Sequence, residues 1–285
     1  MSYRIIPRLD IKGPNLVKGI HLEGLRVLGK PWDFAMKYYQ DGADELIYVD
    51  VVASLYGRNS LKEFITKTAE QVFIPFTVVG GVRTIEDIAD ILQAGADKVG
   101  INTAGINNPD LLEQGAKTFG SQCIVCSIEA KRVDDNYLCF TDNGREWTGK
   151  NVYDWAREAV DRGVGEILLT SIDFEGTGRG FDLELTQKVA DMVPVPVVAC
   201  GGCGQPEHLV QAVCDGHADA ISCASIFHYT YLAEQVDLNE FTSEGNIEFI
   251  KQYKSGQNFL AGRMARLTIP DVKRVLRDAG YQCRA

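Results

Sequence analysis

Short apolar segments alternate with segments of helical periodicity along most of the chain. Each apolar segment has the length of a buried strand, and in the segment after it apolar residues recur every three or four positions. The expected strands are Arg4–Asp10, Glu45–Val51, Phe76–Gly80, Lys98–Ile101, Cys123–Glu129, Glu166–Ser171, Val197–Cys200 and Ala220–Cys223. The helical segments between them include Pro31–Gln40, Thr84–Ala94, Asn151–Arg162 and Gln205–Asp215. Eight strand-then-helix units predict an α/β fold in which a parallel sheet closes into a (β/α)8 TIM barrel.

No linker rich in Gly, Ser or Pro interrupts these units. We therefore expect residues 1–285 to form a single barrel domain. Asn136–Thr148 breaks the pattern after the fifth strand and is expected to form a β-hairpin, with Asp142, Asn143 and Gly144 at its turn.

The two halves of the chain repeat each other. Residues 5–12 match 124–131, 42–50 match 163–171, 74–82 match 195–203, and 96–103 match 218–225, each at an offset of about 120 residues. Four matches in the same order predict two half-barrels related by a pseudo-twofold axis. Features at the carboxyl ends of the strands, where barrel enzymes carry their chemistry, should therefore occur in pairs.

Paired glycines, and small or polar residues on the next strand, end strands in both halves. Glycine frees backbone amides to face a ligand, and a hydroxyl or amide side chain beside a helix N-terminus completes a phosphate-binding cradle. The first half supplies Gly80, Gly81, Asn102 and Thr103, and the second supplies Gly201, Gly202, Ala224 and Ser225. One Gly-Gly pair marks only a tight turn, whereas two copies related by the repeat predict phosphate sites on opposite sides of the barrel mouth. We therefore expect a long substrate with a phosphate at each end.

Asp10 and Glu129 end the first and fifth expected strands, which lie opposite each other in an eight-stranded ring. Two carboxylates that face a central substrate are common equipment for general acid–base catalysis. The alternative is a structural role, in which the two acids form salt bridges with Lys12 and Lys131. Their equivalent positions at the catalytic ends of apolar strands favour the catalytic interpretation.

Four charged residues open apolar strands at the other end of the barrel: Arg4, Glu45, Lys98 and Glu166. Two cations and two anions at similar depth can form a closed salt-bridged ring across the barrel floor, and pairing would offset the cost of burying them. Alternatively, each residue marks the solvated edge of its strand. The spacing alone supports both interpretations equally.

The net charge of −10 argues against nucleic acid or an acidic membrane surface as a partner, because both require a cationic face. The longest apolar runs are strand-sized and the first residues do not resemble a signal peptide, so we expect a cytoplasmic protein with reduced cysteines. Cys123 and Cys126 have a metal-like spacing, as do Cys200 and Cys203, but an offset of three in a strand places the first pair on opposite faces. The four histidines show no chelating spacing, and we expect neither a metal nor a cofactor.

Several long motifs resemble the cyclase subunit of imidazole glycerol phosphate synthase. They include RIIPRLDIKGPNLVKGI, GADELIYVD, PFTVVGGVRTIED, GADKVGINTA, FGSQCIVCSIEAKRV and GEILLTSIDFEGTGRGFD. The resemblance runs from Tyr3 to about Tyr229 with almost no gaps, and it resumes in the expected last helix, IPDVKRVLRDAGYQCR.

The resemblance implies a lyase of histidine biosynthesis. Members of this family take ammonia from a glutaminase partner and add it to an open-chain ribulosyl-aminoimidazole carboxamide that carries two phosphates. They release imidazole glycerol phosphate and aminoimidazole carboxamide ribotide. We therefore expect a heterodimer with a glutaminase subunit and a bis-phosphate substrate.

The resemblance also implies roles for individual positions. Asp10 matches the first catalytic aspartate, Glu129 stands in the place of the second, and Lys18 matches a lysine on a mobile loop that covers the substrate. One phosphate site is implied at Gly81, Asn102 and Thr103, and the other at Gly176, Gly202, Ala224 and Ser225. Five further positions are expected to complete the substrate site: Asp50, Gly80, Ser171, Glu175 and Gly201. The charged ring is implied to be an ammonia gate formed by Arg4, Glu45, Lys98 and Glu166.

Three features depart from the family pattern. Glu129 replaces an aspartate, Arg8 replaces a cysteine, and an insertion of about Thr230–Arg266, with a predicted helix at Gly245–Lys254, follows the eighth strand. Because an unpaired cation inside the barrel would be costly, we hypothesise that Arg8 pairs with Glu129 or Asp10. Pairing with Glu129 would lower the pKa of that carboxyl and suit it to act as a base, leaving proton donation to Asp10 or a substrate phosphate.

Other functions fit part of these observations. A paralogue that delivers ammonia for amidination of a surface-polysaccharide sugar would need the gate but not both phosphate cradles. The sister isomerase of the histidine pathway shares the half-barrel symmetry but needs no ammonia gate. A binding module would need no acid–base pair, so the residues together favour the histidine-pathway cyclase.

Overall fold

The eight expected strands form a closed barrel in the computed structural model, which describes residues 2–53, 62–234, 251–252, 255–256, 260 and 262–284. The barrel strands are β1 (Arg4–Lys12), β4 (Leu46–Asp50), β5 (Phe76–Val79), β6 (Lys98–Ile101), β7 (Ile124–Val133), β10 (Glu166–Ser171), β11 (Val197–Cys200) and β12 (Ala220–Cys223). Each strand pairs in parallel with the next in this order, and β12 pairs with β1 to close the ring. The prediction of a (β/α)8 barrel is confirmed.

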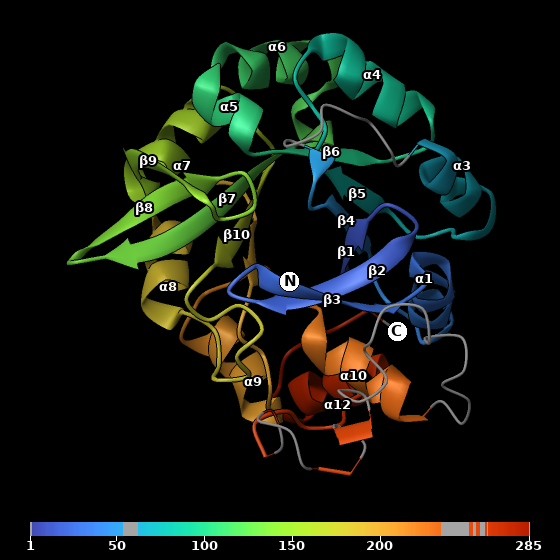
Figure 1. Cartoon of the computed structure of the whole chain (residues 1–285). Coiled ribbons are helices and arrows are strands. Elements are labelled where there is room, and N and C mark those ends of the chain that lie inside the picture. Colours follow the sequence, from blue (N-terminus) through green and yellow to red (C-terminus); the bar gives the residue numbers. More distant parts are fainter. Residues whose placement is uncertain are drawn as a thin grey trace.

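Helices surround the barrel as an outer layer (Figure 1). They are α1 (Pro31–Gln40), α3 (Lys62–Gln71), α4 (Ile85–Gln93), α5 (Thr103–Asn107), α6 (Asp110–Phe119), α7 (Val152–Asp161), α8 (Leu183–Met192), α9 (Pro206–Cys214), α10 (Ser225–Glu234) and α12 (Ile269–Asp278). The predicted bounds of α1 are confirmed, whereas the predicted ends of α4, Thr84 and Ala94, are its capping residues. The Thr84 side chain accepts a hydrogen bond from the Asp87 backbone N–H, and the Asp87 carboxylate accepts one from the Thr84 N–H. This reciprocal cap satisfies two free donors and fixes where the helix begins.

Side chains of β1 alternate between two buried layers. Ile5 and Leu9 pack in the layer between the barrel and the helices, while Ile6 belongs to the cluster inside the barrel. Arg8 and Asp10 share the inward parity of Ile6, which carries them along the lumen to the catalytic end. Each apolar side chain removed from water contributes about 1.5–3 kcal/mol, and a slip of one residue would reverse the whole pattern, so burial fixes the register.

Strand β7 differs from its predicted bounds at both ends. Ser121–Cys123 forms a short 3-10 helix before it, so Cys123 precedes the strand in which it was expected. The strand continues to Val133 because its last residues pair with β8 (Asn136–Thr141).

The predicted hairpin after the fifth barrel strand is confirmed, and it consists of β8 and β9 (Glu146–Asn151). Its turn residues Asp142, Asn143 and Gly144 all have positive φ angles. Asn, Asp and Gly are the residues that tolerate this conformation best, which is why the turn was visible in the sequence.

A second hairpin, formed by β2 (Asn15–Ile20) and β3 (Glu23–Gly29), follows β1 and crosses the barrel mouth (Figure 1). The expectation of a loop at this position is wrong. The turn is made by His21 and Leu22, at φ angles of 54° and 63°. Neither residue belongs to the Asn-Gly or Asp-Gly pairs that usually indicate a hairpin turn.

The insertion after the eighth strand lies largely outside the described residues. Its first residues, Thr230–Glu234, continue α10. The predicted helix at Gly245–Lys254 falls, apart from residues 251–252, outside the part of the chain that the structure describes. Among the described helices, none combines the length and the apolar character needed to cross a lipid bilayer.

Candidate active site

Asp10 and Glu129 lie on opposite sides of the ring, toward the carboxyl ends of β1 and β7. Both are buried, with 2 % of Asp10 and 7 % of Glu129 exposed. The ion pairs of Asp10 are with Arg8 and Lys18 rather than with Lys12 or Lys131. The structural alternative, in which those two lysines neutralise the acids, is therefore wrong.

Asp10 is held between two cations. Arg8 Nε lies 2.7 Å from Asp10 Oδ1, and Lys18 Nζ lies 3.2 Å from Asp10 Oδ2. Burial acts to raise the pKa of Asp10, but the charges of Arg8 and Lys18 outweigh burial and hold the pKa at about 2. Asp10 is therefore an anion across the physiological range.

Glu129 has a different environment. Its Oε2 accepts a hydrogen bond from the Gly144 backbone N–H at 2.8 Å, and no described lysine or arginine forms an ion pair with it. Burial raises the pKa of Glu129 to about 7, although the nearby charge of Arg8 and the Gly144 N–H oppose this change. Of the two predicted partners, Arg8 contacts Asp10, so the pairing with Glu129 and the low pKa expected from it are contradicted.

Arg8 itself spans the lumen below the two acids. Its Nη1 lies 3.1 Å from Thr170 Oγ1 and 3.6 Å from Cys200 Sγ, so the guanidinium also reaches β10 and β11. Only 2 % of the residue is exposed. Burial of this cation is offset by the Asp10 carboxylate, which raises the pKa of Arg8.

Lys18 lies on β2, in the hairpin that covers the mouth, and only 1 % of it is exposed. Its ammonium forms ion pairs with Asp10 and with Glu175, which follows β10. Lys18 therefore lies on a hairpin over the mouth and not on the predicted loop, and its role toward a substrate stays a prediction.

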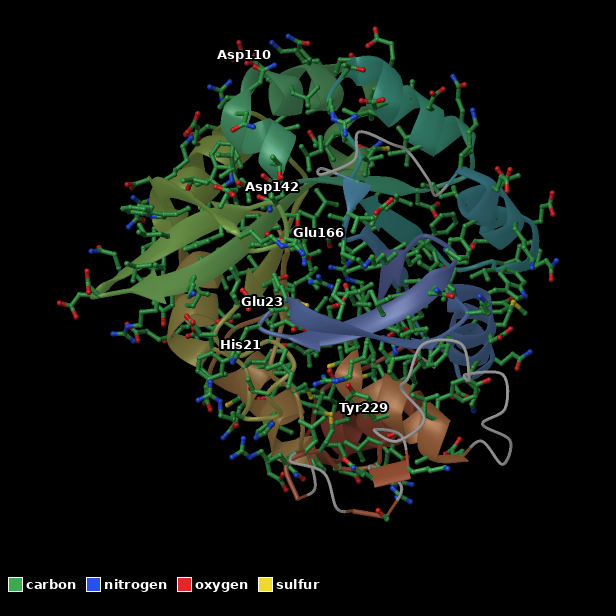
Figure 2. All side chains as sticks on the ribbon, in the orientation of Figure 1. His21, Glu23, Asp110, Asp142, Glu166 and Tyr229 are labelled. Atoms are coloured by element: carbon green, nitrogen blue, oxygen red, sulfur yellow. The ribbon has the colours of Figure 1, made fainter. Side chains whose placement is uncertain are left out.

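Three segments meet above the mouth. Asn143 Nδ2, in the β8–β9 turn, donates a hydrogen bond to the Leu22 carbonyl at 3.0 Å, and the His21 backbone N–H donates to the Glu175 carbonyl at 2.9 Å. Leu22 also belongs to a small apolar cluster with Phe140 and Ile172. In Figure 2, His21 and Asp142 lie around the mouth, and Glu166 is visible nearer its centre. The two hairpins and the segment after β10 therefore form a joint cover.

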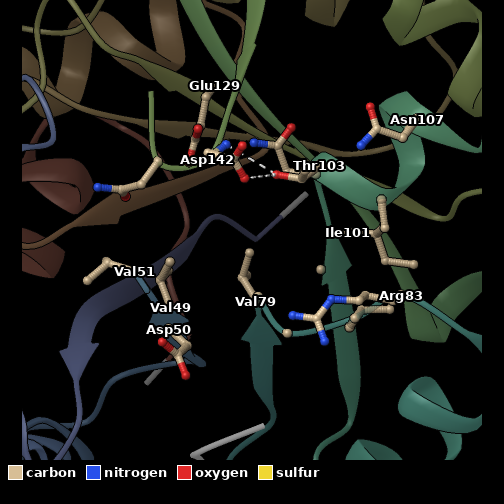
Figure 3. A pocket seen from close by; sticks show the side chains of 17 residues that line it. Val49, Asp50, Val51, Val79, Arg83, Ile101, Thr103, Asn107, Glu129 and Asp142 are labelled. Atoms are coloured by element: carbon tan, nitrogen blue, oxygen red, sulfur yellow. Dashed lines mark hydrogen bonds between the residues drawn. The ribbon is translucent and has the colours of Figure 1, made fainter. Parts of the chain in front are cut away.

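A cavity of about 360 Å³ lies beside Glu129 on the catalytic face (Figure 3). Six predicted site residues line it: Asp50, Gly80, Gly81, Asn102, Thr103 and Glu129. Four other polar residues of its wall were not predicted as site residues: Arg83, Asn107, Asp142 and Asn143, the last two of which were expected only to form a turn. The only available signal was for Arg83, which follows the Gly-Gly pair by two residues.

The first cradle, Gly80, Gly81, Asn102 and Thr103, forms one side of this cavity. The two glycines have φ angles of 101° and 78°. Thr103 Oγ1 accepts a hydrogen bond from the Asp142 backbone N–H at 3.2 Å and lies 3.4 Å from Asp142 Oδ1. Asn102 Oδ1 is buried and has no hydrogen-bond partner, so the cradle retains an unsatisfied polar atom.

The second cradle, Gly201, Gly202, Ala224 and Ser225, lines a smaller cavity of about 20 Å³ together with Glu175 and Gly176. Ser171 does not line this cavity, and its hydroxyl donates to Asp182 Oδ2 at 3.1 Å. Asp182 in turn caps the first turn of α8. The Ser171 hydroxyl therefore supports that helix cap, and its predicted binding role stays a prediction.

In both cradles a glycine lies close to the backbone carbonyl of the neighbouring strand. A Cβ atom on Gly80 would lie 2.8 Å from the Asp50 carbonyl oxygen, and one on Gly201 would lie 2.8 Å from the Ser171 carbonyl oxygen. Both glycines have a positive φ angle near 100°. Any side chain would be strained at either position, so the repeat in the sequence corresponds to a repeat of the fold.

The four charged residues at the barrel floor form a closed ring. Arg4 Nη1 and Nη2 lie 2.8 Å from Glu45 Oε1 and 2.6 Å from Glu166 Oε1. Lys98 Nζ lies 3.0 Å from Glu45 Oε2 and 2.9 Å from Glu166 Oε2. Burial acts to raise the pKa of Glu45, but Arg4 and Lys98 outweigh it and hold the pKa below its usual value. The ring interpretation is confirmed, and the alternative of four solvated strand edges is wrong.

The ring forms part of the wall of a cavity of about 310 Å³ on the floor. All eight cysteines are unpaired thiols. Within the described ranges, no three His, Cys, Asp or Glu side chains lie close enough together to hold a metal ion.

Comparison with known proteins places this site in a family. The model of the family described as histidine biosynthesis protein matches residues 4–233. The chain is 62 % identical over 207 residues to the imidazole glycerol phosphate synthase subunit HisF of Legionella pneumophila, an alignment that covers 72 % of this chain and 98 % of that relative. The chain therefore belongs to the histidine biosynthesis protein family.

Proposed function

We propose that this chain is the cyclase subunit of an imidazole glycerol phosphate synthase. It is a lyase that uses ammonia to convert a bis-phosphate ribulosyl-aminoimidazole carboxamide to imidazole glycerol phosphate and aminoimidazole carboxamide ribotide. The observation that supports this proposal most strongly is a pair of opposed, buried carboxyl groups at the mouth of the barrel. Their affinities for a proton differ. The family match and the 62 % identity to HisF support the same assignment.

The unequal proton affinities divide the chemistry between the two acids. Glu129, with a pKa of about 7, can both release and take up a proton near neutral pH, which is the condition for efficient general acid–base catalysis. When ammonia adds to the substrate carbonyl, the carbonyl oxygen must leave as water, and Glu129 is the group suited to protonate it. Asp10 stays ionised and stabilises the positive charge that develops on the attacking nitrogen.

The two cradles supply the binding sites for the phosphates. Main-chain amides released by the glycine pairs and the hydroxyls of Thr103 and Ser225 suit phosphate oxygens. The second cavity is the smaller one, and Glu175 of its wall is paired with Lys18 of the β2–β3 hairpin. We therefore expect this hairpin to move away for the substrate to enter and to return over it.

Ammonia enters, on this proposal, through the floor. The Legionella relative is named as a subunit of a synthase, and a glutaminase is the partner class that generates ammonia. The ring of Arg4, Glu45, Lys98 and Glu166 and the adjoining cavity form the face on which such a partner would dock. A paralogue that only channels ammonia to a sugar-modifying enzyme is less well supported, because it has no use for two cradles and an acid–base pair.

The decisive experiment is turnover of the bis-phosphate substrate by the purified chain with ammonium salt as the nitrogen source. Both products should form, and Asp10→Asn should abolish this turnover while circular dichroism shows an intact fold. An absence of products at saturating ammonium, with the hairpin and barrel intact, would exclude the cyclase assignment. Wild-type turnover by Asp10→Asn would remove Asp10 from the mechanism.

A further inference from the structure

The cavity that contains the first cradle is poor in positive charge. Asp50, Glu129 and Asp142 contribute three carboxyl groups to its wall, and Arg83 is the one arginine or lysine among its described lining residues. A phosphate monoester brings about −1.5 to −2 charges at pH 7. Ionised acids in the wall would repel such a group unless a cation stands beside it, and Arg83 is the cation that the described lining offers.

Arg83 is placed to provide that cation. In Figure 3 its guanidinium extends from the wall toward Val79, inside the ring of lining residues. Nη2 donates one hydrogen bond, of 2.9 Å, to the Ala53 carbonyl, and within the described ranges no carboxylate forms an ion pair with Arg83. A guanidinium carries five N–H donors, so most of them stay available for a ligand.

The second half of the barrel has no counterpart to Arg83. The repeat that aligns 74–82 with 195–203 places Gly204 at the equivalent position. A Cβ atom on Gly204 would lie 2.3 Å from the Arg263 carbonyl oxygen and 2.6 Å from the Gly178 carbonyl oxygen. The backbone there leaves no room for a side chain, and the described lining of the second cavity contains no arginine or lysine.

The helices that follow the two cradles differ in length. Helix α10, which begins at Ser225 of the second cradle, has ten residues, whereas α5, which begins at Thr103 of the first, has five. Aligned peptide dipoles add along a helix, so a helix of little more than one turn offers a weaker positive end. The helix end at the first cradle is therefore the weaker of the two, which leaves more of the compensation of a bound anion to side chains.

We propose that Arg83 is the counter-ion of the phosphate in the first cradle. This inference rests on the proposed function and names one more residue of the same site. The planar guanidinium can bind two phosphate oxygens at once, which a backbone amide cannot do. The phosphate in the first cradle thus meets a guanidinium, whereas the described lining of the second cradle offers none.

Inorganic phosphate tests this directly, without any turnover. Crystals of the wild type soaked in phosphate should hold one ion in each cradle. Crystals of Arg83→Gln should lose the ion beside Gly81 and Thr103 and keep the ion beside Gly202 and Ser225. In solution, Arg83→Gln should weaken phosphate binding at the first cradle by about 10- to 100-fold, since hydrogen bonds to a charged group are lost. Arg83→Lys should recover part of the lost phosphate affinity, because lysine restores the positive charge but not the two parallel N–H donors of a guanidinium.

Steady-state kinetics with the bis-phosphate substrate provides a second readout. Arg83→Gln should raise KM while kcat changes little, because the interaction is made in the ground state and the transition state alike. Arg274→Gln is the matched control, since Arg274 is an exposed arginine of α12 that pairs with Asp271, and it should leave both constants unchanged. Wild-type phosphate affinity at the first cradle of Arg83→Gln would overturn this inference and leave the cyclase assignment intact. An absence of phosphate from both cradles of the wild type would overturn the two-phosphate substrate as well.

Discussion

Arg8 Nε donates a hydrogen bond to Asp10 Oδ1 at 2.7 Å, which ties the cation of the barrel lumen to one of the two opposed acids. Lys18 approaches the other oxygen of the same carboxylate, at 3.2 Å. The pKa of Asp10 is therefore held at about 2, while burial raises that of Glu129 to about 7. Two acids whose environments separate their pKa values in this way can take different parts in one reaction.

Arg8→Met should lower the free energy of unfolding at pH 7 by about 3–5 kcal/mol, because removing one partner of a buried ion pair leaves the other poorly compensated. Urea denaturation measures this change. Arg274→Met removes an exposed pair with Asp271 and should cost less than about 1 kcal/mol. Equal losses in the two variants would contradict a buried role for the Arg8–Asp10 pair.

The same pair predicts an acid dependence of stability. The folded pKa of Asp10, about 2, lies below its ordinary value of 3.8. Its contribution to stability should therefore be complete above about pH 4 and should be lost as the pH falls toward 2. Arg8→Met raises the folded pKa toward the ordinary value, so its stability should fall less steeply over this interval than that of the wild type. Parallel curves for the two proteins would show that Asp10 is not held ionised by Arg8.

Glu129→Gln should lower kcat by about 10²- to 10⁴-fold, the usual contribution of a general acid–base group. The wild-type kcat should decrease as the pH rises through about 7, where the raised pKa of Glu129 places the loss of its proton. The variant should lack this limb. The measurement uses ammonium salt with the concentration of free ammonia kept constant, since free ammonia itself rises with pH. A limb that persists in Glu129→Gln would assign proton donation to another group.

Lys98→Met should impair glutamine-driven activity by about tenfold or more relative to ammonium-driven activity in the complex with a glutaminase. Lys98 Nζ bonds both acids of the floor ring, and its loss leaves these acids partly buried with one cation instead of two. Lys117→Met is the matched control, because Lys117 pairs with Glu113 on the exposed face of α6. Equal losses in both assays would show that the ring does not lie on the path of ammonia.

Asn143→Ala should loosen the cover over the mouth, because its side chain donates the hydrogen bond that joins the β8–β9 turn to Leu22. Hydrogen exchange at the backbone amides of β2 and β3 should become faster, while exchange in the barrel strands stays unchanged. Asn136→Ala, at the exposed start of β8, serves as the control. Unchanged protection of the β2–β3 hairpin would mean that the two hairpins close independently.

The barrel could be predicted from the sequence because its strands are buried on both faces and contain short apolar runs, of which Val197–Cys200 is the clearest. The glycine pairs could be recognised as candidate binding sites because they occur at equivalent positions in both halves of the sequence. The β2–β3 hairpin could not, since its turn is His21-Leu22 and a lysine, Lys18, occupies a fully buried position. A lysine in an alternating pattern normally indicates the solvent face.

The sequence also could not predict which residues contact each other across the barrel. Strand parity indicated that Arg8 points inward, but not which of the two acids it meets, because that depends on the stagger of β1 against β7. Asp142 and Asn143 were recognised as turn residues, and nothing in the local sequence shows that the turn folds back over Thr103. Contacts of this kind depend on the three-dimensional closure of the barrel rather than on local periodicity.

The shared approach of Gly80 to the Asp50 carbonyl and of Gly201 to the Ser171 carbonyl has a consequence for molecular length. Both cradles are built from main chain that is locked into neighbouring barrel strands, so their separation is as rigid as the barrel. A ligand that engages both must span this fixed gap. The two cradles therefore select ligands by length. A molecule whose charged ends match the fixed separation can occupy both cradles, whereas a shorter molecule can occupy only one and gains about half of the binding energy.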